Sequence, residues 1–298
     1  MRRGWLKRRF TQLPAKVEKY LPREYSKVAG IQSVQKLGNN IGGYRGETLD
    51  LKTVLADMDR AATAANWTRD HIDLPSSDPA ALFGFIAYRR SPNRPRRRLY
   101  ISTGIHGDEP AGPLAVLQLL RENQWPDDLA LWLCPCLNPA GFTINRRENP
   151  AGIDLNRDYR HFQSAEARTH VAWLEAQPEF DFSLCLHEDW ESQGFYLYET
   201  NPRGLPSFAD KIIDNVATVC PIDRSPVIEG WPAQNGIIRP ALKPEDRPQW
   251  PEALYLIAKH KTRLGCTLEA PSDFPMPTRV AALVTGVRSA LQSVQVRE

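Results

Sequence analysis

One stretch of the chain decides its fold: Leu99-Tyr100-Ile101-Ser102-Thr103-Gly104-Ile105-His106-Gly107-Asp108-Glu109. It begins with a mostly apolar run typical of a buried β-strand, and a polar turn follows directly. A second apolar run, over residues 180–186, also ends directly before a histidine, His187. Two imidazoles and a carboxylate suit Zn²⁺, and three protein ligands leave a fourth position for water, as a catalytic site requires. We therefore take His106, Glu109 and His187 as candidate ligands of one zinc ion per chain.

Strand and helix patterns alternate along the chain. Apolar runs predict strands at 81–88, 99–105, 129–134, 180–186, 194–198 and 264–269, and helical patterns predict helices at 112–123, 164–176, 206–219 and 277–294. Fully apolar strands between helices indicate a mostly parallel sheet that is covered on both faces. The predicted fold is therefore α/β, a single domain of three α/β/α layers around a mixed, mostly parallel central sheet.

The two histidines and a glutamate late in the chain share one position relative to the predicted strands. His106 and His187 follow apolar strands, and Glu269 ends a late short strand. In open α/β sheets, functional sites form at the carboxyl ends of the strands. We therefore expect these three residues to lie at the same edge of the sheet.

Two further motifs lie between the histidines. The first is Asn138-Pro139-Ala140-Gly141, and the second is Arg147-Glu148-Asn149-Pro150-Ala151-Gly152-Ile153-Asp154-Leu155-Asn156-Arg157. The order HxxE, NPxG, RxNxxGxDLNR, distal His and late strand-end Glu resembles that of the zinc carboxypeptidase family. The HGDE spelling and the short gap from NPxG to DLNR look most like its bacterial murein-peptide amidase branch. The resemblance spans roughly residues 98–275.

The resemblance implies a role for each matched residue. Glu269 would be the general base that takes a proton from water and returns it to the leaving amine. Asp154 would accept a hydrogen bond from the first zinc histidine and so hold its tautomer. Arg147 would stabilise the tetrahedral oxyanion. Asn156 and Arg157 would grip the terminal carboxylate of the substrate, which a planar guanidinium can bind bidentately.

The activity implied is zinc-dependent hydrolysis of an amide bond near the C-terminal carboxylate of a peptide-like substrate, such as a cell-wall peptide. The sequence departs from the family in having Ala140 where Asp is common and Asp158-Tyr159 where Asn-Phe is usual. The mobile tyrosine of digestive members has no match, and Tyr255 is better explained as a packed aromatic. A deacylase of N-acyl amino acids, like succinylglutamate desuccinylases and aspartoacylases, therefore stays open. A non-catalytic peptide-binding protein is a third alternative.

Composition agrees with an enzyme of this kind. The chain has 298 residues, of which 42% are hydrophobic, enough for a substantial core, and its net charge of +3 is too small to imply nucleic-acid binding. Its five cysteines have no framework spacing, which favours reduced thiols in a reducing compartment. No stretch approaches the ~18 apolar residues of a membrane span, and the N-terminus lacks the apolar region of a signal peptide. We expect a cytoplasmic protein.

The organisation predicted from these patterns is a basic N-terminal extension, 1–45, followed by a zinc hydrolase domain, 46–298. Within the domain, residues 221–251 contain seven prolines and no strong periodic element. Because this segment leads back to the strand that carries Glu269, we expect it to form a wall of the cleft.

Two sets of polar residues have no motif to explain them. The acidic run Glu188-Asp189-Trp190-Glu191 could repel an anion, favour a cationic group, hold the outer shell of the metal, or simply form a solvated loop. The remaining histidines lack metal-ligand spacing, so we interpret them as surface or structural residues: His71, His161, His170 and His260.

Overall fold

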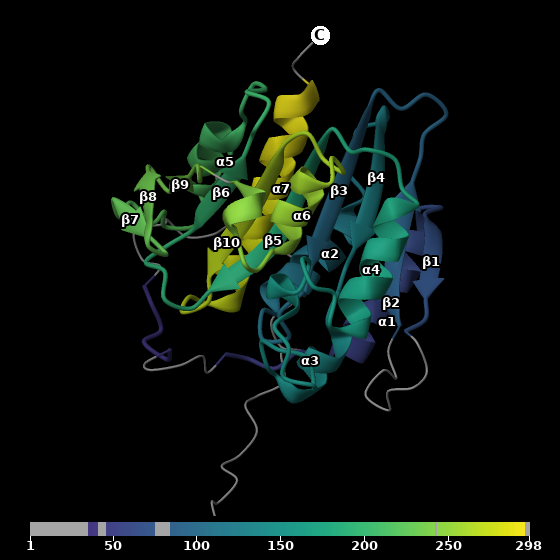
Figure 1. Ribbon diagram of the computed structural model, residues 1–298, viewed down its shortest axis with the longest axis horizontal. Helices are drawn as coiled ribbons and strands as arrows, with labels where there is room; N and C mark the ends of the chain where they lie inside the picture. Colours follow the sequence, from purple (N-terminus) through teal and green to yellow (C-terminus); the bar gives the residue numbers. More distant parts are fainter. Residues whose placement is uncertain (1–34, 41–45, 75–83, 242, 296–298) are drawn as a thin grey trace, which may run out of the picture.

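The structure is a computed structural model, and it describes residues 35–40, 46–74, 84–241 and 243–295. The predicted basic extension, 1–45, lies almost entirely outside these residues. Helices cover both faces of one ten-stranded sheet (Figure 1). The predicted α/β fold, with a mixed sheet between two helical layers, is confirmed.

The strands of the sheet lie in the order β1-β2-β4-β3-β5-β10-β6-β9-β8-β7. Their bounds are β1 Thr68–Ile72, β2 Phe85–Arg90, β3 Arg97–Thr103, β4 Leu129–Cys134, β5 Phe182–Asp189, β6 Tyr196–Thr200, β7 Val227–Ile228, β8 Trp231–Gln234, β9 Ile237–Ile238 and β10 Gly265–Pro271. The central strands β4, β3, β5 and β10 run parallel, whereas β2 and β6 pair with this core antiparallel. The parallel strands occupy the middle of the sheet, where both faces are buried by helices.

The helices form two layers. Their bounds are α1 Leu51–Ala64, α2 Ala111–Glu122, α3 Pro139–Ile144, α4 Ala165–Glu175, α5 Ala209–Val216, α6 Glu252–Ala258 and α7 Met276–Gln295. Buried residues of α1, α2, α5 and α7 form one core against the sheet, and those of α4 and α6 form a second core on its other face (Figure 1). Within the described ranges, none of the helices combines the length and hydropathy that crossing a bilayer requires.

Alternation along β5 and β10 separates the core from the functional side chains. Leu186 and Leu268 point into the core under α7, and their neighbours His187 and Glu269 therefore point to the opposite face. The apolar pattern predicts that both strands end at or before these two residues. This boundary is wrong: β5 and β10 continue pairing as far as Asp189↔Pro271. The strands extend beyond their apolar runs because alternate side chains of this last stretch, His187, Asp189 and Glu269, face a cleft, which accepts polar groups.

The other predicted elements are present with shifted ends, and residues 81–83 of the strand predicted at 81–88 lie outside the described residues. The helix predicted at 206–219 is shorter, Ala209–Val216, whereas α1, α6 and β1 were not predicted. Residues 221–251 contain only short elements, and the strands β7, β8 and β9 among them extend the sheet beyond β6.

Candidate metal centre and active site

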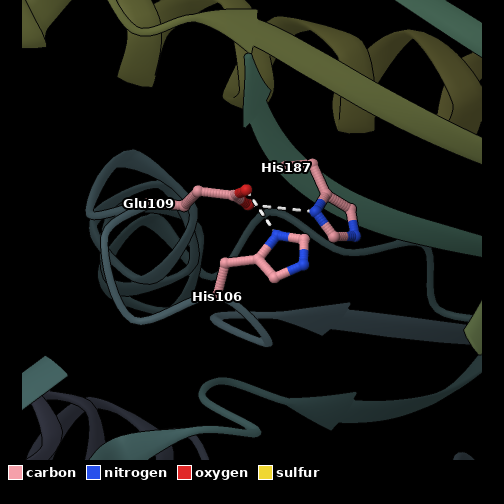
Figure 2. A group of neighbouring side chains, drawn as sticks. All are labelled: His106, Glu109 and His187. Carbon is pink, nitrogen blue, oxygen red and sulfur yellow. Dashed lines mark hydrogen bonds and ion pairs between the residues drawn. The ribbon is translucent and has the colours of Figure 1, made fainter. Parts of the chain in front are cut away.

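Two histidines and a glutamate converge beside the carboxyl ends of the central strands (Figure 2). The loop between β3 and α2 carries His106 and Glu109, and β5 carries His187. The Nδ1 atom of His106 lies 2.5 Å from Oε1 of Glu109, and Nδ1 of His187 lies 3.0 Å from Oε2. One potential ligand atom from each residue lies within 4.8 Å of the others, and all three side chains are buried. The three predicted ligands are therefore brought together.

The loop that carries His106 needs a glycine next to this histidine. A Cβ atom on Gly107 would lie 2.1 Å from the carbonyl carbon of Gly141 and 2.5 Å from the carbonyl oxygen of Arg146. The loop and the α3 turn are also joined by a 2.8 Å hydrogen bond from the Asn138 N–H to the Gly104 carbonyl. This close approach of two backbones links the HxxE and NPxG motifs and places the chain after Arg146 beside the metal ligands.

Asp154 connects the ligand cluster to Arg147. Its Oδ1 lies 3.2 Å from Nε2 of His106, and its Oδ2 accepts a 2.9 Å hydrogen bond from Nε of Arg147. A proton on Nε2 leaves Nδ1 as the lone-pair nitrogen that faces Glu109. Burial would raise the pKa of Asp154, but the hydrogen bond from His106 and the neighbouring positive charges bring this pKa well below its usual value. The donor set therefore fits a divalent cation.

Glu269 lies in one row with His187 and a tyrosine. It pairs with His187 of β5 on one side and with Tyr196 of β6 on the other. Burial raises the pKa of Glu269 to about 8, and the negative charges of Glu109 and Asp189 act in the same direction. The carboxyl group thus lies next to the ligand cluster without being part of it.

A cleft of about 600 Å³ contains the ligand cluster. Its floor is formed by side chains of β5, β10 and β6, including Cys185, Thr267 and Tyr198. The proline-rich segment 221–251 contributes a wall, which confirms the predicted position of that segment. Charged residues outside the ligand cluster line both sides of the cleft: Arg147, Asp154, Arg157, Glu188, Asp189, Glu191, Glu229, Arg247 and Glu269.

The side chain of Asn156 is oriented by a residue that the sequence analysis missed. The backbone N–H of Glu252, at the start of α6, donates a 2.9 Å hydrogen bond to Oδ1 of Asn156. The carboxyl group of Glu252 is buried and accepts 2.7 Å hydrogen bonds from the hydroxyls of Tyr100 and Ser102. Because Oδ1 of Asn156 is engaged, the amide turns its NH₂ group elsewhere. No local signal marks Glu252, since its partners lie about a hundred or more residues away in the sequence.

The acidic run after His187 divides in two: Glu188 and Asp189 lie in β5, whereas Glu191 is exposed in the bend that follows. Glu188 is buried and forms an ion pair with Nη1 of Arg279 at 2.8 Å, and it also accepts a hydrogen bond from the Ala111 N–H. Asp189 faces the cleft, where it accepts a 3.1 Å hydrogen bond from the Tyr196 hydroxyl. Alternation along β5 gives these adjacent carboxylates different environments.

The remaining histidines agree with their interpretation as surface or structural residues. His71, His161 and His260 are exposed, whereas His170 is buried and hydrogen-bonded to Tyr100 and Tyr159. Tyr255 is a packed aromatic residue in the core beside α4, as expected.

The chain is similar in sequence to two kinds of known protein. Residues 95–208 match the family described as succinylglutamate desuccinylase/aspartoacylase catalytic domain. Carboxypeptidase SOL1 of Arabidopsis thaliana is 41% identical over 104 residues, which cover 28% of this chain and 21% of SOL1. The chain thus spans about a fifth of the length of that curated relative.

Solved structures share the fold. A Shewanella denitrificans chain, provisionally named a metallopeptidase, is 24% identical with a TM-score of 0.68, covering 80% of this chain and 88% of its own. A metallo-carboxypeptidase from Pseudomonas aeruginosa, solved with (2-guanidinoethylmercapto)succinic acid, is 18% identical with a TM-score of 0.55, covering 80% and 68%. The fold is therefore that of the metallocarboxypeptidases.

Proposed function

We propose that this chain, which shares the fold of the zinc carboxypeptidase-like hydrolases, is a zinc metallopeptidase of the carboxypeptidase or peptide-amidase type. Its reaction would be hydrolysis of an amide bond near the C-terminal carboxylate of a peptide-like substrate. The observation that carries the proposal is the convergence of His106, Glu109 and His187 in one cleft beside Glu269. A general base next to three ligands is the arrangement that metal-assisted hydrolysis needs.

The ligand residues would hold Zn²⁺ through Nδ1 of His106, the carboxylate of Glu109 and Nδ1 of His187. When bound, zinc supplies Lewis-acid activation of the carbonyl group and lowers the pKa of a bound water to about 7. Glu269 accepts the proton of the attacking water and returns it to the nitrogen of the leaving amine.

Three polar residues bind and orient the substrate. Nη1 of Arg147 lies 3.3 Å from Nδ1 of His106, so its guanidinium is close enough to stabilise an oxyanion that forms at the cluster. Arg157 forms no ion pair with a carboxylate among the described residues and lines the cleft. It binds the terminal carboxylate of the substrate together with the NH₂ group of Asn156.

A deacylase acting on N-acyl amino acids is the second candidate, because residues 95–208 match the succinylglutamate desuccinylase/aspartoacylase catalytic domain. Both reactions cleave an amide bond, and both leave a free amine. They differ in the acyl side of the substrate, which is an aminoacyl group in one reaction and a simple acid in the other.

The test is metal analysis followed by a substrate panel. Protein purified without chelator should contain about one zinc per chain. It should hydrolyse peptides that carry a free C-terminal carboxylate, lose this activity with chelator, and regain it with Zn²⁺. Cleavage of N-acyl amino acids but of no peptide would favour the deacylase. Zinc binding without turnover of either class would leave a binding protein and overturn the proposal.

A further inference from the structure

An arginine from the proline-rich wall lies in the cleft against an aromatic ring. Arg247 and Trp231 both line the cleft, and Cζ of Arg247 lies 4.6 Å from the centroid of the Trp231 ring. Such a contact holds the cation by its attraction to the ring and leaves its N–H groups for other acceptors. Stacking also restricts the conformations of the arginine side chain, so less rotamer entropy is lost when it binds a ligand.

The backbone around Arg247 is tied to the segment that follows the carboxylate-binding residues. The Arg247 carbonyl accepts a hydrogen bond from the Arg160 guanidinium, and its N–H donates to the Pro244 carbonyl at 3.2 Å. Close by, the Tyr159 N–H donates to the Trp250 carbonyl at 3.2 Å. These bonds hold the Arg247 loop in a defined position relative to Arg157.

Arg247 has no carboxylate partner in the part of the chain that the structure describes. Arg147, in contrast, is paired with Asp154 at 2.9 Å. The cleft contains carboxylates that could have neutralised Arg247, and Glu229 is only two residues from Trp231. The absence of an ion pair leaves a cation in the cleft whose charge the protein does not neutralise by direct contact. Arg157 also has no carboxylate partner among the described residues, so the cleft presents two such arginines to a ligand.

We infer that Arg247, held by Trp231, binds a second carboxylate of the substrate, in addition to the terminal carboxylate assigned to Arg157 and Asn156. The substrate class is therefore an acidic peptide-like amide with two carboxylates. The inference rests on the proposed function, because it takes the ligand of the cleft to be a substrate. The binding contact itself can be measured without turnover. The second carboxylate belongs either to the acyl side or to the amine side of the scissile amide, and the experiment separates these sources.

The test uses two pairs of ligands, each differing in one carboxylate. N-acetyl-Glu-Gly and N-acetyl-Gln-Gly differ on the acyl side, and N-acetyl-Gly-Glu and N-acetyl-Gly-Gln differ on the amine side. Binding is measured by calorimetry in the zinc-loaded Glu269→Gln protein, and turnover is measured with Glu269 intact. Each background is compared with its Arg247→Ala, Arg247→Lys and Arg224→Ala derivatives. Arg224 is the matched control, an exposed arginine of the same segment that contacts Asn235 outside the cleft.

In one of the two pairs, the protein with Arg247 intact should bind the carboxylate ligand at least tenfold more tightly than its amide partner. Arg247→Ala should abolish this preference, Arg247→Lys should retain only a part of it, and Arg224→Ala should leave it unchanged. The pair that responds identifies the side of the second carboxylate.

Three results would overturn the inference: no preference in either pair, an equal preference after Arg247→Ala, or a full preference after Arg247→Lys. The last would mean that only the charge matters, without a directional contact. An Arg247-dependent binding preference without turnover of any ligand would contradict the proposed function alone. Turnover without that preference would contradict the inference alone.

Discussion

Protonation of one buried histidine should make the protein less stable in mild acid. His170 of α4 is 2% exposed. Its Nε2 lies 2.9 Å from the Tyr100 hydroxyl, which donates its own proton to Glu252, so Nε2 is the donor of this pair. The Tyr159 hydroxyl lies 2.6 Å from Nδ1 and donates to it. Both ring nitrogens are therefore satisfied in the neutral form, and a second ring proton would remove the acceptor of Tyr159.

The size of the effect follows from the pKa. Burial lowers the pKa of His170 to about 3, whereas an unfolded histidine titrates near 6.5. Between these values the unfolded chain binds a proton that the folded protein does not, so stability falls as the pH falls through 6.5 towards 3. Each pH unit in this window costs about 1.36 kcal/mol. Because the unfolded histidine is only half protonated at pH 6.5, lowering the pH from 6.5 to 4.5 should remove about 2 kcal/mol through this residue.

The assay is urea unfolding of the wild type and of His170→Phe at several pH values. The variant should be less stable at neutral pH, because Tyr159 loses its acceptor at a cost of about 1–3 kcal/mol. This cost does not depend on pH, so the stability gap should close by about 2 kcal/mol between pH 6.5 and 4.5. The other titratable groups that face His170 are Tyr100, Tyr159, Cys134 and Glu252, and they are present in both proteins. Parallel pH profiles for the two proteins would refute the reasoning.

Three further predictions concern the cleft and its support. Glu269→Gln should retain zinc and the fold but lose about 10²–10⁴-fold in turnover, because an amide cannot accept the proton of water; near-normal turnover of the zinc-loaded variant would reassign the base. Arg157→Ala should lower kcat/KM for substrates with a free terminal carboxylate, because it removes hydrogen bonds worth about 1.5–3 kcal/mol each. In this variant, amidating that carboxylate should cause little further loss in kcat/KM. Independent losses from the two changes would mean that Arg157 does not contact the carboxylate. Arg279→Met should lower the free energy of unfolding by about 3–5 kcal/mol, because it leaves the carboxylate of Glu188 buried without its partner. Urea unfolding should show that adding Glu188→Gln recovers part of the loss, and a loss unchanged by the second substitution would contradict this origin.

The sequence was most informative where function and local structure use the same residues. Asp154 lies in a motif whose resemblance to the zinc carboxypeptidases implies a partner for the first histidine, and its carboxylate lies 3.2 Å from Nε2 of His106. The glycine of the HGDE stretch is required by a close approach of two backbones. Such requirements act on a few neighbouring positions, and they therefore leave a readable pattern.

Other features left no such pattern. The helix α6 is short, Glu252–Ala258, and it follows a proline-rich segment, so neither length nor periodicity indicates it. The buried Glu252 and the ring contact of Arg247 depend on residues that are distant in the sequence or that lie in a segment without regular elements. Glu188 and Asp189 read as one acidic run, although alternation along β5 pairs the first with Arg279 and the second with the Tyr196 hydroxyl.

The sequence by itself determined the α/β class, the order along the chain in which the central strands and helices follow one another, and the residues that converge as candidate zinc ligands. These features follow from hydrophobic periodicity and from short motifs, which are properties of neighbouring residues. Only the tertiary structure decided that β5 extends through His187, that Glu252 orients Asn156, and that Arg247 lies against Trp231 in the cleft. The physical reason is that burial and hydrogen-bond partners are set when distant segments pack together, and hydropathy along the chain carries no record of which segments will meet.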